Sequence, residues 1–414
     1  MSEIKSNRVK YYTAFIAVAF AFFAWGFLTC LNDILIPHLK NTFSLNYAQA
    51  MLIQMAFFGA YAFFSAPMAN LVCRINYTKS LGLGFLAISL GCFSFLPAAY
   101  FCSYEMFLTS LMIVALGIVM LQVAANPFAS LLGKPETSAS RLTLMQGINS
   151  SAKAIAPLFG GLFILQAGSH SMGVHEMAMI ASRPYVYFSL LFFVIFIVFF
   201  RMQFDAIEKN IMPDEQGGAN RLLSYGQLLK KKRVFFGCLA VFMYIGADVA
   251  VGSFLIIYLK QPKIGHLTAQ AAANFVALYW AGYIIGRFAG ALLLKRIKVT
   301  ALLIWHSCAA VLLILISIHS HYNLAIYTMT AVGLCNSIIF PGVFGLAIRQ
   351  LGENIPRVSG LLCSCICGGA LIPFVQGIVA DQTSVQFSFY VPMICYFFAI
   401  FYAINGYDKS VAID

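Results

Sequence analysis

Long apolar stretches alternate with short polar connections along almost the whole chain. About twelve stretches reach bilayer length, because roughly 20 residues at 1.5 Å each cross the hydrocarbon core. Backbone groups find no partners in lipid, so each stretch predicts a helix. The sequence therefore predicts an all-α membrane protein with twelve transmembrane helices, at residues 11–37, 47–72, 79–100, 106–132, 142–167, 184–204, 234–259, 270–294, 299–319, 322–348, 358–380 and 385–406.

Composition agrees with a lipid environment. Hydrophobic residues make up 61% of the 414 residues and charged residues only 10%, which is too little polar surface for a soluble protein of this length. The net charge is +12, but the cations lie in the connections and not along one face, so nucleic acid is not an expected partner. The first span follows MSEIKSNRVKYY without a small-residue cleavage site, which predicts a retained helix.

The distribution of lysine and arginine predicts the orientation. If the N-terminus is cytoplasmic, twenty of the 26 cations fall on inner segments. The positive-inside rule then favours an even number of spans with both termini in the cytoplasm. The outer connections hold only four cations, which are Lys40, Arg183, Lys260 and Lys263.

The longest polar connection divides the chain into two halves of six spans. It ends in KKKR and predicts a cytoplasmic linker at 205–233, between an N-terminal bundle at 1–204 and a C-terminal bundle at 234–414. Span four carries Asn126 and Pro127, and span ten carries Asn336 and Pro341, so corresponding helices are expected to be broken or kinked. Matched interruptions indicate a binding site at the midplane between two repeats, although Gly and Pro also serve packing alone. A second pair in register is Pro157 and Pro373.

Four charged residues fall well inside predicted spans. They are Asp33, Asp248, Lys153 and Arg287. Each costs roughly 2.5–3.5 kcal/mol at membrane depth, so they are expected to face one another, a cavity or polar helix ends. For Asp33, a role in ion coupling or substrate binding is preferred over a structural ion pair. Arg287 stands near Lys295 and Arg296, so it is expected to snorkel towards the cytoplasm.

Neutral amides recur at helical spacing on two spans. Gln122 and Asn126 are four residues apart, and Gln146, Asn149 and Lys153 share one face of the next span. Together with Asn32, these groups suit a ligand with many hydroxyls, on whose ring an aromatic side chain can stack. Amides of this kind also hold helices together without any ligand. The candidate aromatic residues are Trp25, Tyr61, Tyr279 and Trp280.

No residue pattern predicts an enzyme, a metal site or a cofactor. The seven histidines are scattered, and no phosphate-binding glycine loop or HExxH helix is present. The eleven cysteines lie in or beside apolar spans without disulfide or zinc spacing, so they are interpreted as small buried residues.

Several motifs carry a resemblance to a known family. The segments LNDILIP, LQVAANP, GADVAVGSF and CNSIIFPGVFG, with others spread over nearly the whole chain, resemble the fucose and glucose/galactose permease branch of the major facilitator superfamily. The resemblance implies two six-helix bundles, alternating access and symport of a monosaccharide with a proton or a sodium ion. A monosaccharide, a coupled ion and the lipid bilayer are thus the expected partners, for a chain that works as a monomer.

The resemblance also implies roles for single residues. Asn32 and Asp33 match the LND of the family's first helix, whose aspartate is implicated in coupling, and Gln146 and Asn149 match amides of the sugar site. Gln122 stands where fucose permeases have glutamate, whereas glucose/galactose members have LQVAANP as here. The candidate set is therefore Asp33, Lys153 and Asp248 for ion coupling, and Asn32, Gln122, Asn126, Gln146, Asn149 and Asn336 for substrate.

Two residues depart from the family pattern. Asp248 stands where relatives have glutamate, and Lys153 stands where a small or hydroxyl residue is usual. An ammonium group at position 153 would hold Asp33 ionised and occupy the place of a sodium ion; alternatively, Lys153 is hydrated at the cytoplasmic exit.

The resulting expectation is uptake of glucose or galactose, and less so of fucose, across the bacterial inner membrane. A proton-coupled exporter of a drug or small metabolite is the alternative, and a channel or sugar sensor is less favoured.

Overall fold

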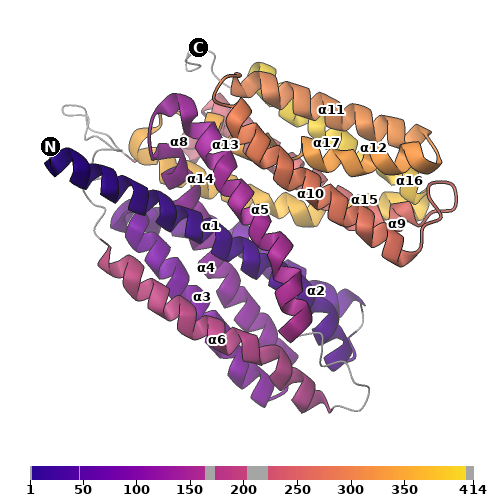
Figure 1. Cartoon of the computed structure of the whole chain (residues 1–414), viewed down its shortest axis with the longest axis horizontal. Helices are drawn as coiled ribbons and strands as arrows, with labels where there is room; N and C mark the ends of the chain where they lie inside the picture. Colours follow the sequence, from indigo (N-terminus) through magenta and orange to yellow (C-terminus); the bar gives the residue numbers. More distant parts are fainter. Residues whose placement is uncertain (1, 46, 164–172, 203–221, 407–414) are drawn as a thin grey trace. The chain divides into compact units, whose positions relative to one another are not determined.

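The computed structural model describes residues 2–45, 47–163, 173–202 and 222–406. Within these ranges the chain is helical and has no strand. It divides into two compact units, one formed by 1–132 and 148–220 and the other by 133–147 and 221–414 (Figure 1). Most of the linker predicted at 205–233 lies outside the described residues.

The first unit contains the helices that correspond to the first six predicted spans. Their bounds are α1 Ser2–Thr42, α2 Tyr47–Ile75, α3 Tyr77–Tyr100, α4 Tyr104–Leu131, α5 Ser138–Phe163 and α6 Val174–Arg201. Helix α5 is continuous, but its residues up to Gly147 belong to the second unit.

Close packing of α3 holds the first unit together. The helix lies beside both α4 and α6 (Figure 1). At Gly91, an added Cβ would stand 2.6 Å from the backbone nitrogen of Val114, so only glycine allows this approach of α3 to α4. On the other side, Phe95 stacks on Tyr185 with ring centroids 4.0 Å apart. These contacts place the polar positions of α4 on a rigid support.

The second unit contains the remaining spans, several of which are divided into shorter helices. The bounds are α8 Tyr225–Leu229, α9 Lys232–Leu259, α10 Ala269–Leu293, α11 Val299–His319, α12 Tyr322–Cys335, α13 Ile339–Ile348, α14 Ile355–Ser364, α15 Gly368–Gln382, α16 Val385–Ser388 and α17 Tyr390–Phe401.

Two predicted spans of the second unit are interrupted. Residues 336–338 separate α12 from α13, and the 3-10 turn Cys365–Cys367 separates α14 from α15. In the first unit, by contrast, α4 runs unbroken through Asn126 and Pro127. Of the two predicted breaks, the one in the second unit is therefore present and the one in α4 is absent. Proline removes only one donor from the α4 ladder, so the helix tolerates it.

The glycine stripe of α10 faces the first of these interruptions. A Cβ on Gly286 would stand 2.6 Å from the Oγ of Ser337, and Gly282 packs against Leu334. The spacing of Gly282, Gly286 and Gly290 allows this close helix packing. This close packing brings the side chains of α10 within reach of Asn336.

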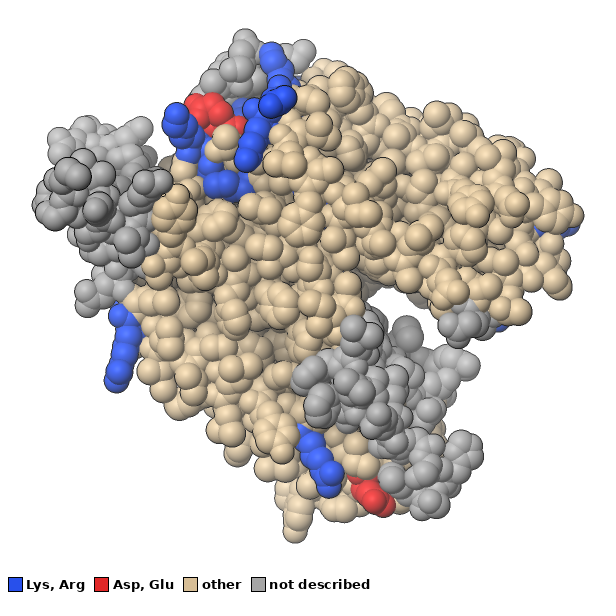
Figure 2. All heavy atoms as spheres, viewed as in Figure 1, with Lys and Arg blue, Asp and Glu red and all other residues tan. Residues whose placement is uncertain are grey.

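Eleven helices in the described residues are long and apolar enough to cross a membrane. The one predicted span that is not among these eleven is the fifth, which corresponds to α5; this helix has 26 residues and carries a polar face with Gln146, Asn149 and Lys153. Uncharged residues cover most of the face shown in Figure 2. The twelve-helix architecture predicted from the sequence is confirmed.

Candidate functional site

Asp248 on α9 is the centre of a hydrogen-bonded cluster in the second unit. Its Oδ1 accepts from the Nδ2 of Asn336 at 2.9 Å and from the hydroxyl of Tyr279 at 3.3 Å. Its Oδ2 accepts from the hydroxyl of Tyr283 at 3.2 Å. Asn336 also donates to the Tyr279 hydroxyl, at 2.9 Å. Three donors thus converge on one half-buried carboxylate at membrane depth, which is how a costly charge is accommodated there.

The interruption between α12 and α13 supplies the amide of this cluster. The carbonyl oxygen of Asn336 lies at the end of α12 and accepts from the hydroxyl of Tyr244 at 2.6 Å. The Oδ1 of Asn336 accepts from the hydroxyl of Tyr396 on α17, also at 2.6 Å. Asn336 is fully buried, so tyrosines replace the water that an open helix end would otherwise need.

Arg287 extends the cluster along α10. Its Nη2 donates to the hydroxyl of Tyr283 at 3.1 Å, and its Cζ lies 4.3 Å from the centroid of the same ring. Its Nη1 donates to the carbonyl oxygen of Gln146 on α5 at 2.7 Å. The side chain is 6% exposed, so the expectation that it snorkels to the cytoplasmic surface is wrong. One helical turn separates Tyr283 from Arg287, which lets the ring cover the guanidinium.

In the first unit, Gln122 and Tyr61 join α4 to α2. The Nε2 of Gln122 donates to the Tyr61 hydroxyl at 2.6 Å. Tyr61 is buried, whereas Gln122 is half-buried. The amide is therefore oriented by a rigid aromatic neighbour, which is a suitable arrangement for selective hydrogen bonding.

Asn149 fixes α5 to α1. Its Nδ2 donates to the carbonyl oxygen of Phe22 at 2.8 Å, and its side chain is 2% exposed. Gly26, one turn further along α1, makes the approach possible, since a Cβ there would stand 2.5 Å from the same Nδ2. Asn149 thus has a packing role in addition to any contact with a ligand.

The other predicted site residues lie as follows. Asn126 is fully buried in α4 and Gln146 is nearly so in α5, while Lys153 is half-buried about two turns further along the same helix. Asn32 and Asp33 belong to α1, but their side chains lie outside the described residues.

Of the four aromatic residues proposed to stack on a sugar ring, three are buried. Trp25, Tyr61 and Tyr279 are each at most 3% exposed, whereas Trp280 is 38% exposed. Tyr61 and Tyr279 instead use their hydroxyl groups to orient Gln122 and Asp248. Trp280 is therefore the member of this set whose ring is accessible.

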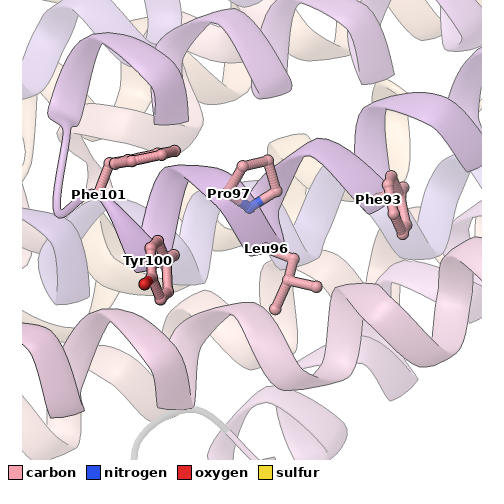
Figure 3. Close-up of a pocket in the computed structure, with 5 residues that line it drawn as sticks. All are labelled: Phe93, Leu96, Pro97, Tyr100 and Phe101. Atoms are coloured by element: carbon pink, nitrogen blue, oxygen red, sulfur yellow. The ribbon is translucent and has the colours of Figure 1, made fainter.

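A surface pocket at one end of α3 has a different character. It is lined by Phe93, Leu96, Pro97, Tyr100 and Phe101, all on α3 or directly after it (Figure 3). Phe93, Tyr100 and Phe101 are more than half exposed on a helix apolar enough to span a membrane. Because aromatic rings and aliphatic groups form most of its lining, the pocket is suited to lipid chains and not to a polyhydroxylated ligand.

Within the described ranges, no group of three or more His, Cys, Asp or Glu side chains is placed to hold a metal ion. His319 and His321 form an HxH motif, and the two side chains have different partners. His319 contacts the hydroxyl of Tyr390, and His321 contacts the carbonyl of Lys263. The motif therefore contributes to local structure.

Sequence reasoning missed four members of the Asp248 cluster, which are Tyr244, Tyr283, Tyr396 and, in this role, Arg287. A signal for three of them exists in the spacing. Tyr244 and Asp248 are four residues apart on α9, and Tyr279, Tyr283 and Arg287 follow at four-residue intervals on α10. Tyr396 comes from a distant span and carries no such signal.

Comparison with known proteins places these features in a family. The Major Facilitator Superfamily profile matches residues 14–372. A glucose/galactose transporter of Brucella abortus is 40% identical over 403 residues, which cover 97% of this chain and 96% of that protein. An L-fucose-proton symporter of Escherichia coli is 30% identical over 419 residues, with coverage of 97% and 94%.

A solved structure agrees with the same assignment. The crystal structure of the E. coli fucose:proton symporter FucP superposes with a TM-score of 0.85 at 27% identity, covering 97% of this chain and 100% of that one. A match of this extent in both sequence and fold establishes the relationship: the chain is a member of the major facilitator superfamily.

Proposed function

We propose that this chain is a secondary active transporter that takes up glucose or galactose together with a proton. The observation that carries the proposal is the 40% identity, over nearly both full lengths, to a protein named a glucose/galactose transporter. A relative at 30% identity is named a proton symporter, which supports the proton as the coupled ion. Relatives with transporter names also bear out the expectation that the chain is not an enzyme.

The choice of sugar is supported by Gln122. Fucose permeases resemble this chain but have glutamate at the matching position, and here an amide is held by the hydroxyl of Tyr61. An amide both donates and accepts hydrogen bonds, whereas a carboxylate only accepts, so the two side chains select different hydroxyl arrangements. Asn32, Asn126, Gln146, Asn149 and Asn336 complete the proposed set of sugar-binding and orienting amides.

The proposed coupling groups are Asp33, Lys153 and Asp248. Sugar and a proton enter from outside, and protonation of Asp33 removes a charge from within the first predicted span. The loaded carrier then closes at lower cost and opens inward. Loss of a charge at membrane depth is worth roughly 2.5–3.5 kcal/mol, which is sufficient to shift such an equilibrium.

The orientation is proposed from the charge pattern, the bundle bounds from the polar linker and the monomeric state from the family resemblance. Both termini face the cytoplasm of a bacterial inner membrane, the bundles are 1–204 and 234–414, and one copy is sufficient for transport. Membrane-impermeant labelling of single cysteines placed at positions 5 and 409 tests the orientation, because cytoplasmic sites react only after the membrane is opened.

Uptake into proteoliposomes tests the function. Radiolabelled glucose and galactose are offered under an imposed proton gradient, an imposed sodium gradient or neither, with unlabelled fucose as competitor. The proposal expects accumulation above equilibrium with the proton gradient and weak competition by fucose. Accumulation driven by a sodium gradient alone would mean that sodium, and not the proton, is the coupled ion. Absence of any sugar uptake would overturn the proposed function. Proton-driven efflux of bulky cations would instead support the exporter, which the relatives do not favour.

A further inference from the structure

A continuous series of contacts runs from Asp248 to the backbone of α5. The Tyr283 hydroxyl donates to Asp248 at 3.2 Å and accepts from Arg287 at 3.1 Å. The other guanidinium arm of Arg287 donates to the Gln146 carbonyl at 2.7 Å. One tyrosine hydroxyl thus joins a carboxylate to a guanidinium, and the guanidinium holds a second helix.

The guanidinium of Arg287 is buried and shares the hydroxyl of Tyr283 with the carboxylate of Asp248. A guanidinium stays protonated in proteins, and here it is 6% exposed. A buried cation is stable only when an anion and hydrogen-bond acceptors compensate it. The hydroxyl of Tyr283 and a backbone carbonyl are neutral, whereas Asp248 supplies a full negative charge through the same hydroxyl.

The contact with α5 is part of a wider seam. The Oγ of Ser140 donates to the carbonyl of Ala291 at 2.5 Å, and a Cβ on Gly147 would lie 3.3 Å from the ring of Phe288. Helix α10 therefore holds α5 from Ser140 to Gly147. Beyond Gly147 the same helix continues to Asn149 and Lys153, two of the proposed site residues.

We propose that Arg287 is a positioning residue that ties the charge of Asp248 to the first half of α5. While Asp248 is negative, Arg287 stays between Tyr283 and the Gln146 carbonyl and keeps α5 on α10. When residue 248 is neutral, the guanidinium loses its compensating charge and the seam loosens. This inference rests on the proposed transport function for its purpose, because a seam that responds to charge lets ion coupling act on a helix of the sugar site.

Hydrogen–deuterium exchange of the intact protein in nanodiscs tests the link without any sugar. Asp248→Asn mimics the neutral side chain, and Tyr283→Phe removes the hydroxyl while keeping the ring over Arg287. Both variants are expected to speed exchange in the peptide covering 138–150 by roughly 5–150-fold, the range of a typical coupling energy. Tyr258→Phe is the matched control, because it removes a buried tyrosine hydroxyl of α9 that contacts Ser317 instead. Unchanged exchange in Asp248→Asn or Tyr283→Phe, or an equal increase in the control, would overturn the proposal.

A double-mutant series in which each charge is neutralised tests what the link does during transport. Arg287→Gln and Asp248→Asn are compared alone and together, for sugar exchange at equilibrium and for accumulation driven by a proton gradient. The double variant is expected to recover exchange relative to Arg287→Gln, because no unpaired buried charge remains. Its accumulation is expected to stay roughly 5–150-fold below wild type.

Two results of this series count against the inference. Recovery of both exchange and accumulation would reduce the pair to a structural role, and additive losses would show that the two residues act independently. If the wild type moves no sugar, the proposed function fails. The hydrogen–deuterium exchange of residues 138–150 still decides whether Asp248 controls the contacts between α5 and α10.

Discussion

The Nε2 of Gln122 donates a 2.6 Å hydrogen bond to the hydroxyl of Tyr61, which joins α4 to α2. This bond orients the amide by which we propose that glucose and galactose are distinguished from fucose. Tyr61→Phe removes the acceptor and leaves the ring in place. One net hydrogen bond is worth about 0.5–1.5 kcal/mol, so the Kd for glucose should rise roughly 2–10-fold.

Equilibrium binding of glucose to the purified variant checks this expectation. Ser89→Ala is the control, because it removes a buried hydroxyl that bonds Ser189 between α3 and α6 of the same unit. An equal loss of affinity in Ser89→Ala would mean that general loosening, and not the orientation of Gln122, is responsible.

Gly26 is expected to be intolerant of any larger side chain. A methyl group there would stand 2.5 Å from the Nδ2 of Asn149 and displace its bond to Phe22. Gly26→Ala should therefore destabilise the protein by about 1–3 kcal/mol, as overpacking does in other cores. Gly59→Ala is the matched control, because nothing lies within 4 Å of its Cβ position. Thermal unfolding in detergent makes the comparison, and equal midpoints for the two variants would contradict the packing role of Gly26.

Asp33→Asn should separate sugar movement from accumulation. The asparagine is permanently neutral, so sugar exchange at equilibrium should persist while uptake against a gradient is lost. Asp381→Asn, an exposed acid at the end of α15, is the control and should accumulate sugar normally. Continued uphill accumulation by Asp33→Asn would show that another group carries the coupling.

Lys153→Thr tests whether an ammonium group takes the place of a sodium ion. Removal of the cation should create or strengthen a dependence of glucose uptake on sodium, because a vacant position beside a carboxylate can accept another cation. Uptake at a series of sodium concentrations measures this. Lys263→Thr changes an exposed lysine in the connection between α9 and α10 and should leave the dependence unchanged. The same ion dependence in Lys153→Thr and wild type would favour a hydrated Lys153.

The architecture was predictable because the bilayer imposes a length and a polarity on every span. Helix α5 was predicted by the same rule, from its length, although it carries amides on one face. The partners of single polar groups were less accessible. Asp248 was identified from its cost in lipid, but Asn336 and Tyr396 lie 88 and 148 positions away in the chain, and no local pattern connects them.

Arg287 shows most clearly which contacts could not be predicted from the sequence. Its distance from Lys295 suggested that it reaches the cytoplasmic surface, since long cations near a helix end commonly do. The contacts that hold it inside come from Tyr283, one turn away, and from a backbone carbonyl on α5. A carbonyl carries no signature in the sequence, so tertiary packing alone decided the direction of this side chain.

The assignment of α5 to both compact units has a consequence for protein engineering. Residues 133–147 belong to the unit formed mainly by the second half, although the chain reaches them before α6. Two fragments made by cutting the gene between α6 and α8 would each lack something: the first would carry Ser140 without Ala291, and the second would leave that face of α10 bare. Each fragment should aggregate when it is produced alone. The two fragments should become soluble in detergent only when they are co-expressed and can associate.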